Sequence, residues 1–218
     1  MNKFIKELTL LVLILLPIVY LATIWQKLPE IVPTHFSNSG VVNGWSHKSM
    51  LIYLTVGLGF GIYLLMLAIP YIDPKKKIKQ IDEKYYNFRF IITFFLAILS
   101  TNLVYISKVG SLNNPNLILV VLGSFFAILG KFMKTMQPSY FIGFRTPWTL
   151  ESDHTWKKTH QLAGPIWMVG GTMIALLSIF FAHKTVIPYI SFGIIAIMCL
   201  VPFVYSYIVY RNEEREEL

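Results

Sequence analysis

Long apolar runs alternate with short charged stretches along the whole chain. Six windows of 18 residues or more contain no Asp, Glu, Lys or Arg, and they cover residues 8–26, 49–72, 90–107, 109–130, 159–182 and 185–210. About 20 apolar residues in a helix cross the ~30 Å hydrocarbon core of a bilayer. Asn113-Asn114-Pro115-Asn116 has turn chemistry, so we expect the third and fourth windows to form a helical hairpin. The pattern predicts six transmembrane helices.

A polar, aromatic stretch over residues 131–164 interrupts this pattern between the fourth and fifth spans. Ser152 is a good N-cap residue, which predicts a short helix from that point. Trp156 and His160 are four residues apart and share one face of it. Gly164-Pro165 predicts its end, because proline is favoured as the first residue of a new helix. We expect a short amphipathic helix at the inner membrane surface, with the fifth span at 165–182.

Composition agrees with a membrane protein. Of the 218 residues 55% are hydrophobic and 14% charged, against about 25% charged in a soluble domain. The first run follows two lysines, as in a signal peptide, but it is long and lacks an Ala-x-Ala-like cleavage site. The predicted fold is an all-α integral membrane protein with a single polytopic domain over residues 1–218. Its spans are expected at about 8–26, 49–72, 90–107, 109–130, 165–182 and 185–210.

The distribution of Lys and Arg predicts the orientation. With six spans, 15 of these 19 residues fall in the compartments that hold the two termini. Cytoplasmic loops carry the excess of Lys and Arg, so both termini are expected in the cytoplasm of a bacterial cell. The net charge of +8 then reflects topology and anionic lipid headgroups. We expect no direct binding of nucleic acid, since the basic residues are not gathered on a domain with a reading element.

The first long loop, residues 27–48, is predicted to lie outside the cell. Its prolines forbid helix, and its Gly, Asn and Ser residues are turn signals. Trp25 and Trp45 flank it, as aromatic residues do at a membrane interface. His35 and His47 are candidates for metal ligands or a pH switch, against the alternative of hydrogen-bonded loop histidines. A zinc site takes three or four ligands, and only Glu30 is nearby.

The inner stretch contains the residue types of acid–base catalysis. Glu151, Asp153, His154 and His160 are candidates, but the two histidines are six residues apart and diverge on a helix. The sequence therefore predicts no enzyme and no metal or other cofactor. The windows also lack the ionisable groups that ion-coupled transporters carry at the membrane midplane. The glycines at 57, 59, 61, 170 and 171 are interpreted as close helix-packing positions.

Two motifs resemble one known family. Ile142-Gly-Phe-Arg-Thr-Pro-Trp-Thr-Leu150, followed by Trp156, Thr159-His160 and Leu162-Ala-Gly164, resembles the signature of the SdpI-type immunity proteins of Gram-positive bacteria. The loop Leu28-Pro-Glu-Ile-Val-Pro-Thr-His-Phe36, with Gly40, is similar to a small domain of unknown function at the N-terminal end of many of these proteins. Ser139 and Phe144 are mild departures from the family pattern.

The resemblance implies a non-enzymatic membrane protein that protects its cell from a secreted, membrane-active toxic peptide. In the best-known system of this type the protein also senses the toxin and holds a cytoplasmic autorepressor at the membrane. The expected outer sensing residues are Pro33, His35, Phe36, Gly40 and Trp45. The expected inner interaction residues are Gly143, Arg145, Thr146, Pro147, Trp148, Trp156, His160 and Gly164. The alternatives are a transport or permeation protein of unknown substrate and a structural, lipid-organising protein.

Overall fold

The computed structural model describes residues 2–37, 40–73, 82–111, 116–181 and 184–216. Its helices are α1 (Lys3–Ile24), α2 (Ser49–Ile52), α3 (Gly59–Ile72), α4 (Asp82–Val109), α5 (Leu117–Met133), α6 (Pro147–Glu151), α7 (Asp153–Phe180) and α8 (Ile187–Glu216), and its strands are β1 (Ile31–Phe36) and β2 (Val42–His47). A π-helical segment (Tyr53–Leu58) joins α2 to α3.

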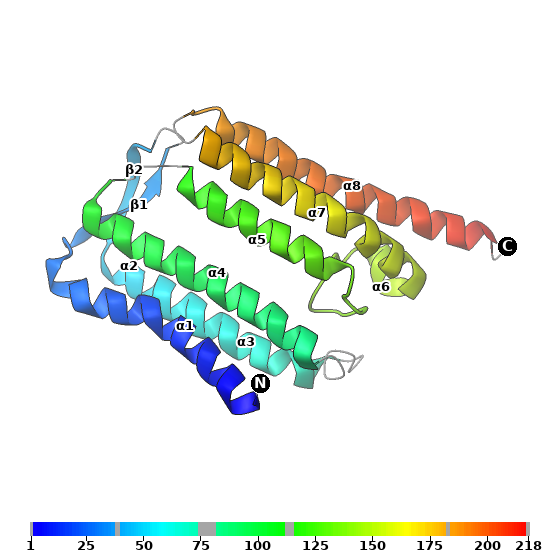
Figure 1. The fold of residues 1–218 in the computed structure, drawn as a ribbon, viewed down its shortest axis with the longest axis horizontal. Helices are drawn as coiled ribbons and strands as arrows, with labels where there is room; N and C mark the ends of the chain where they lie inside the picture. Colours follow the sequence, from blue (N-terminus) through cyan, green and yellow to red (C-terminus); the bar gives the residue numbers. More distant parts are fainter. Residues whose placement is uncertain (1, 38–39, 74–81, 112–115, 182–183, 217–218) are drawn as a thin grey trace.

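The long helices form two groups of three (Figure 1). Helices α1, α3 and α4 make one group, and α5, α7 and α8 make the other. The groups meet where α4 faces α5, and there Phe95 stacks on Phe125 with the ring centroids 3.9 Å apart. The β-hairpin lies at one end of the bundle, and both termini lie at the opposite end. We call the line of contact between α4 and α5 the seam.

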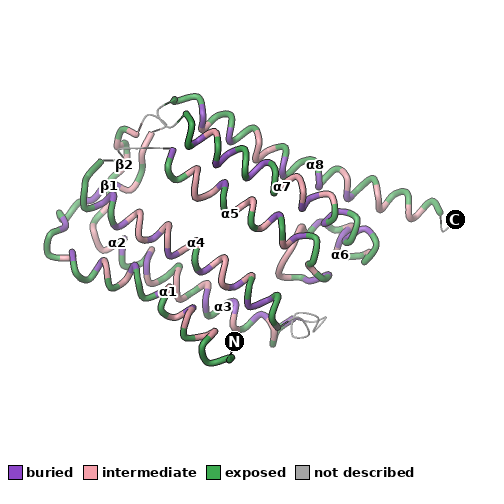
Figure 2. Tube along the Cα trace, in the orientation of Figure 1, coloured by how far each residue is buried: buried purple, intermediate pink, exposed green. Residues whose placement is uncertain are grey.

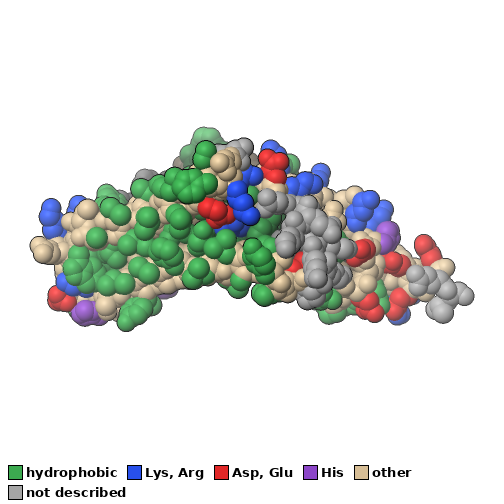
Figure 3. Space-filling model, turned by 90° about the horizontal axis from the view of Figure 1, so that it is seen from below, with side chains coloured by type: hydrophobic (Ala, Val, Ile, Leu, Met, Phe, Trp, Pro, Cys, Tyr) green, Lys and Arg blue, Asp and Glu red, His purple; other side chains and the backbone are tan. Residues whose placement is uncertain are grey.

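Within the described residues, five helical segments are long and apolar enough to cross a membrane: Lys3–Lys27, Ser49–Ile72, Glu83–Val109, Asp153–Phe180 and Ile187–Glu216. Helix α5 is apolar but has only 17 residues, about 26 Å of helix. Exposed residues follow the outer faces of both groups (Figure 2), and Phe180 and Phe192 are each 75% exposed. In Figure 3 apolar side chains cover the flank, while most charged ones gather towards the two ends. So wide an apolar surface is typical of contact with lipid.

The predicted start of the fourth span is wrong. The fourth span was expected at 109–130, but α5 begins at Leu117. Gly110, with φ of +77°, follows the end of α4, which is why the two helices cannot be contiguous there. Of the predicted turn only Asn116 lies within the described residues; its side-chain amide donates to the carbonyls of Phe181 and Lys184.

The predicted extent of the short amphipathic helix is also wrong. Ser152 caps a helix as predicted, since its Oγ accepts the N–H of Thr155 at 3.0 Å. That helix, however, is α7, which continues past Gly164-Pro165 to Phe180. A Cβ on Gly164 would lie 2.9 Å from the carbonyl oxygen of Gly130 in α5. The glycine therefore serves close packing rather than termination, and that packing keeps the chain helical through the proline.

Helices α5 and α7 approach each other through glycines. A Cβ on Gly123 would lie 2.6 Å from the Gly171 carbonyl oxygen, and Gly130 and Gly164 form a second such contact. Close backbone approach lets dispersion forces hold helices together where the hydrophobic effect cannot. The packing role predicted for Gly171 is confirmed. Gly57 is different, because a Cβ there would meet nothing within 4 Å.

Helices α1 and α4 carry an ion pair. Arg89 donates from both terminal nitrogens to the carboxylate of Glu7, at 2.8 and 2.9 Å, and the hydroxyl of Tyr63 donates to the same carboxylate. The charge-free windows stop just short of Glu7 and Arg89, so the pattern of charges did not reveal that both lie inside helices. A bidentate pair fixes the relative position of the two helices.

Prolines inside the helices free carbonyls that neighbouring side chains bind. Pro202 has no N–H for the carbonyl of Met198, and Trp167 of α7 donates to that oxygen from Nε1 at 2.8 Å. In α3, the hydroxyl of Tyr85 donates to the carbonyl that Pro70 leaves free. A backbone carbonyl without a hydrogen-bond partner in lipid costs on the order of several kcal/mol of free energy.

Candidate functional site

The inner stretch is organised around His160. Its Nε2 accepts the backbone N–H of Phe144 at 2.8 Å, and its Nδ1 donates to the carbonyl of Trp156 at 2.9 Å. Both ring nitrogens are used, so the imidazole is neutral with its proton on Nδ1. Trp156 stacks on His160 with the centroids 4.1 Å apart, and its Nε1 donates to the Met136 carbonyl. The two rings anchor the chain that leads from α5 to α6.

Gly143 closes this arrangement. Its φ is +116°, and a Cβ there would lie 2.7 Å from both the His160 Nε2 and the Trp156 ring. Glycine adopts this backbone conformation without a steric penalty. The motif places Gly143, Trp156 and His160 together, as an internal contact.

Helix α6 is attached to α8. Thr146 caps α6 in a capping box with Thr149, and its Oγ1 lies 3.1 Å from the Ser206 hydroxyl. Trp148 packs between Phe203 and Tyr207, with centroid distances of 5.4 and 5.1 Å. Pro147 occupies the first turn of α6, where its missing N–H has no helical partner to lose.

The N-terminal end of α7 receives a carboxylate from α8. Glu213 accepts from the hydroxyls of Ser152 and Thr155 at 2.6 and 3.0 Å, and the imidazole of His154 is 3.6 Å away. A carboxylate at the start of a helix also interacts favourably with its dipole. This contact joins the polar stretch to the end of the chain, and sequence spacing gave no sign of it.

The structure separates the expected inner residues by exposure. Thr146, Trp156 and His160 are buried, so their side chains are not available to a partner in this conformation, and the backbone at Gly164 is buried as well. Arg145 is exposed and donates to the Tyr140 carbonyl at 2.7 Å. Of the expected set, the side chains on the surface are Arg145 and Pro147, together with part of Trp148.

The outer loop contains the β-hairpin, which the all-α prediction missed. Strands β1 and β2 are antiparallel, and Pro33 pairs with Trp45 while His35 pairs with Gly44. Gly40 has φ of +81°, as its turn sequence allows. Asn43 and Gly44, two of the loop's Asn and Gly residues expected to form turns, lie within β2 instead. A Cβ at position 44 would meet the Cβ of His35 at 2.8 Å, so the glycine is needed where the two strands pair. Val42 and Trp45, the two large apolar residues of β2, are three positions apart, so the period-two alternation that marks a strand is absent from this sequence.

The hairpin histidines each have a local partner. His35 Nδ1 bonds to the side chain of Asn43, and His47 Nε2 lies 3.0 Å from the Glu30 carboxylate. Lys48 also binds Glu30, at 2.8 Å, and its ammonium holds the pKa of that carboxyl below its ordinary value. Neither histidine approaches a metal-binding set: within the described ranges, no group of three His, Cys, Asp or Glu side chains could hold an ion.

The expected outer residues differ in exposure. Trp45 is 61% exposed and His35 is exposed, while Phe36 is half-buried. Pro33 is buried and Gly40 is half-buried in the turn. Three of the five thus present side chains to the surroundings.

At the end beside the hairpin, here named its outer end, the seam opens into a cavity of about 310 Å³. We call it the outer cavity. One wall comes from α4, α5 and α8, and the other is the segment from Thr34 to Ser37 at the end of β1. The lining residues of the helices are all apolar: Leu99, Leu103, Ile106, Ile118, Leu119 and Pro188.

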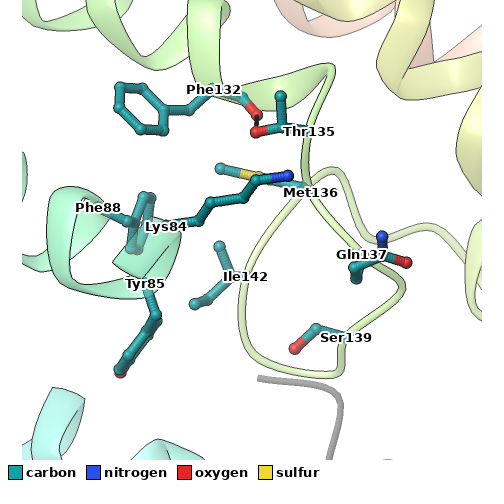
Figure 4. Close-up of a pocket in the computed structure, with 9 residues that line it drawn as sticks. All are labelled: Lys84, Tyr85, Phe88, Phe132, Thr135, Met136, Gln137, Ser139 and Ile142. Atoms are coloured by element: carbon teal, nitrogen blue, oxygen red, sulfur yellow. Dashed lines mark hydrogen bonds between the residues drawn. The ribbon is translucent and has the colours of Figure 1, made fainter. Parts of the chain in front are cut away.

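The inner end of the seam is nearly closed. The crevice there holds about 30 Å³, room for two or three water molecules at most. Lys84 extends across it from α4 towards Thr135 and Met136, and Ile142 of the polar stretch closes one side (Figure 4). Between crevice and outer cavity stands the Phe95–Phe125 stack. Among the described residues, therefore, the two spaces are not one passage.

Comparisons with known proteins match both motifs. Residues 135–206 match the SdpI/YfhL protein family, and residues 12–60 match a domain of unknown function (DUF1648). The chain is similar to the immunity protein SdpI of Bacillus subtilis (strain 168), with 27% identity over 211 residues that cover 96% of this chain and 99% of that protein. No solved structure matches it. The resemblance noted from the two motifs is confirmed.

Proposed function

We propose that this chain, a member of the SdpI/YfhL protein family, is a multi-pass membrane immunity protein that protects its cell from a secreted, membrane-active toxic peptide. The observation that carries the proposal is the similarity to the immunity protein SdpI over nearly the full length of both chains. The apolar flanks support a location in the membrane, where such a peptide acts.

We also propose an orientation. The hairpin faces outwards, and the termini and the polar stretch face the cytoplasm. Support comes from the charges, since 15 of the 19 Lys and Arg residues fall on the side of the termini. In this orientation an arriving peptide first meets His35, Phe36 and Trp45, while Pro33 and Gly40 shape the strands that carry them. The Lys and Arg residues at the inner end would contact anionic headgroups.

Toxin sensing and repressor sequestration belong to the same proposal. We infer that a cytoplasmic autorepressor docks on the exposed part of the polar stretch, at Arg145 and Trp148, while Gly143, Trp156, His160 and Gly164 hold that surface in place. Arg145→Ala should reduce co-purification of a repressor encoded beside this gene, whereas Lys157→Ala, at another exposed site, should not. Unchanged co-purification by Arg145→Ala and Trp148→Ala would remove this part of the proposal.

The immunity function is tested by expression in a sensitive Gram-positive host. The host is challenged with membrane-active peptides purified from cultures of Bacillus subtilis strain 168 and of the organism that encodes this chain. Cells that produce the chain should grow at peptide concentrations that stop cells with an empty vector. Equal sensitivity to every peptide, with the chain present in the membrane, would contradict the proposal.

A further inference from the structure

The outer cavity has two chemically different walls. Leu99, Leu103 and Ile106 are spaced along one face of α4 and make an apolar wall with residues of α5 and α8. Opposite them, Thr34 and His35 of β1 and Ser37, just after it, bring hydroxyl and imidazole groups beside the ring of Phe36. With about 310 Å³, the cavity has the size of a small-ligand site. It is large enough for a few apolar side chains of a peptide ligand, with the peptide's backbone next to the wall that carries the polar groups.

The rim of the cavity carries a cation at Lys184. Within the described chain, Glu30 is the one carboxylate at the hairpin end, and it is already bound by Lys48 and His47. Lys184 precedes the lining residue Pro188, and its carbonyl accepts from Asn116, which is two residues before the lining residue Ile118. Its side chain is exposed. A cation at this place attracts an anionic group and repels a cationic one.

The cavity also joins parts of both segments that match family models. Its polar wall belongs to the segment at 12–60, and Pro188 belongs to the segment at 135–206. Asn116 ties the α7–α8 connection, which contains Lys184, to the start of α5 through the carbonyls at 181 and 184. The rim is thus held by fixed contacts, and a preformed site loses less entropy on binding.

We propose that the outer cavity is the toxin-binding site: it takes apolar side chains of the peptide from the outer part of the membrane, while a carboxylate of the peptide faces Lys184. This inference rests on the proposed immunity function. A peptide is favoured over a lipid acyl chain because Thr34 and His35 bring polar groups to one wall of the cavity, which suit a peptide backbone better than a hydrocarbon chain. The other occupant, a phospholipid, is an outcome of the test.

The test compares two isoleucines of α5. Ile118 lines the cavity and is 46% exposed; Ile128 does not line it and is 45% exposed. Ile118→Trp should lower the peptide concentration that stops growth by about tenfold at unchanged abundance in the membrane. Ile128→Trp should protect like the wild type. Lys184→Glu should weaken protection several-fold, and Lys184→Arg should preserve it.

The outcomes separate the two proposals. If the wild type protects and Ile118→Trp at normal abundance protects equally, the cavity is not the site although the immunity function stands. If Ile118→Trp displaces a co-purifying phospholipid without changing protection, the cavity is a lipid site and the inference is overturned. If the wild type protects against no peptide, the immunity function fails and the inference fails with it.

Discussion

The two ends of the seam between α4 and α5 differ in what their polar side chains do. At the inner end, His160, Trp156 and Thr146 are buried and bonded within the chain, and the crevice beside them is nearly filled. At the outer end, His35 and Trp45 are exposed, and a cavity of about 310 Å³ lies under the strand. The inner motif is more distinctive in sequence, yet the outer end has the space for a ligand.

This difference shows that a distinctive motif can serve the fold rather than binding. Gly143, Trp156 and His160 depend on one another, because the two rings stack and leave no room for a Cβ at position 143. Substitutions at the inner end should therefore lower stability, and substitutions at the outer end should lower protection without a loss of protein.

Gly143→Ala should have the largest effect on stability. The alanine would have to keep the positive φ of Gly143, and its Cβ would lie 2.7 Å from His160 and Trp156. We expect a loss of about 2–3 kcal/mol, with less protein in the membrane. The measurement is the thermal unfolding midpoint in detergent. Gly193→Ala is the control, because a Cβ there would meet nothing within 4 Å; an equal midpoint shift in both variants would contradict the account.

His160→Phe should cost about 1–2 kcal/mol. Phenylalanine keeps the stack on Trp156 but has no acceptor for the Phe144 N–H. His154→Phe is the matched control, since His154 is exposed and makes only a 3.6 Å contact with Glu213. Unfolding midpoints of the two variants check this. If His160→Phe is as stable as His154→Phe, the hydrogen bond does not hold the stretch.

The pairing of Trp167 with the carbonyl freed by Pro202 predicts a coupled pair of mutations. Trp167→Phe alone should cost about 1 kcal/mol. In a Pro202→Ala background the cost should fall, because the alanine N–H restores the helical bond to Met198. A double-mutant cycle of unfolding free energies measures the coupling. Additive effects would show that the indole does not replace the missing donor.

The smallest effect concerns Glu30. Lys48 lowers the pKa of its carboxyl from the ordinary value of 4.5, so the ion pair stabilises the hairpin above that pH. The contribution is lost as the pH falls through the lowered pKa. The protection of the β2 amides in the wild type, which is the exchange rate corrected for the intrinsic rate at each pH, should therefore fall at acid pH. Glu30→Gln should remove this pH dependence; a wild-type profile in that variant would contradict it.

Much of the fold follows from the sequence, because long charge-free windows have few alternatives to membrane helices. The windows at 8–26, 49–72, 90–107 and 185–210 coincide with helices in the structure. The pairing of Trp156 with His160 on one helix face is also confirmed. Both results depend on local spacing, which the sequence states directly.

The errors arise where contacts distant in sequence decide. Gly164-Pro165 has the local chemistry of a helix end, but the contact of Gly164 with Gly130 keeps α7 intact. The charge-free windows begin just after Glu7 and Arg89, because the local sequence of neither residue shows that the two form an ion pair. The outer cavity, formed by four separate segments, has no signal in the sequence at all.

The most direct test of the account asks where the peptide touches the protein. In a Cys199→Ser background, single cysteines replace Leu119 in the outer cavity and Met136 in the inner crevice. The purified variants are placed in lipid nanodiscs, and their alkylation rates are measured with and without the peptide against which the wild type protects. The account predicts slower alkylation at position 119 and no change at position 136. Protection of position 136 with none at position 119 would contradict it.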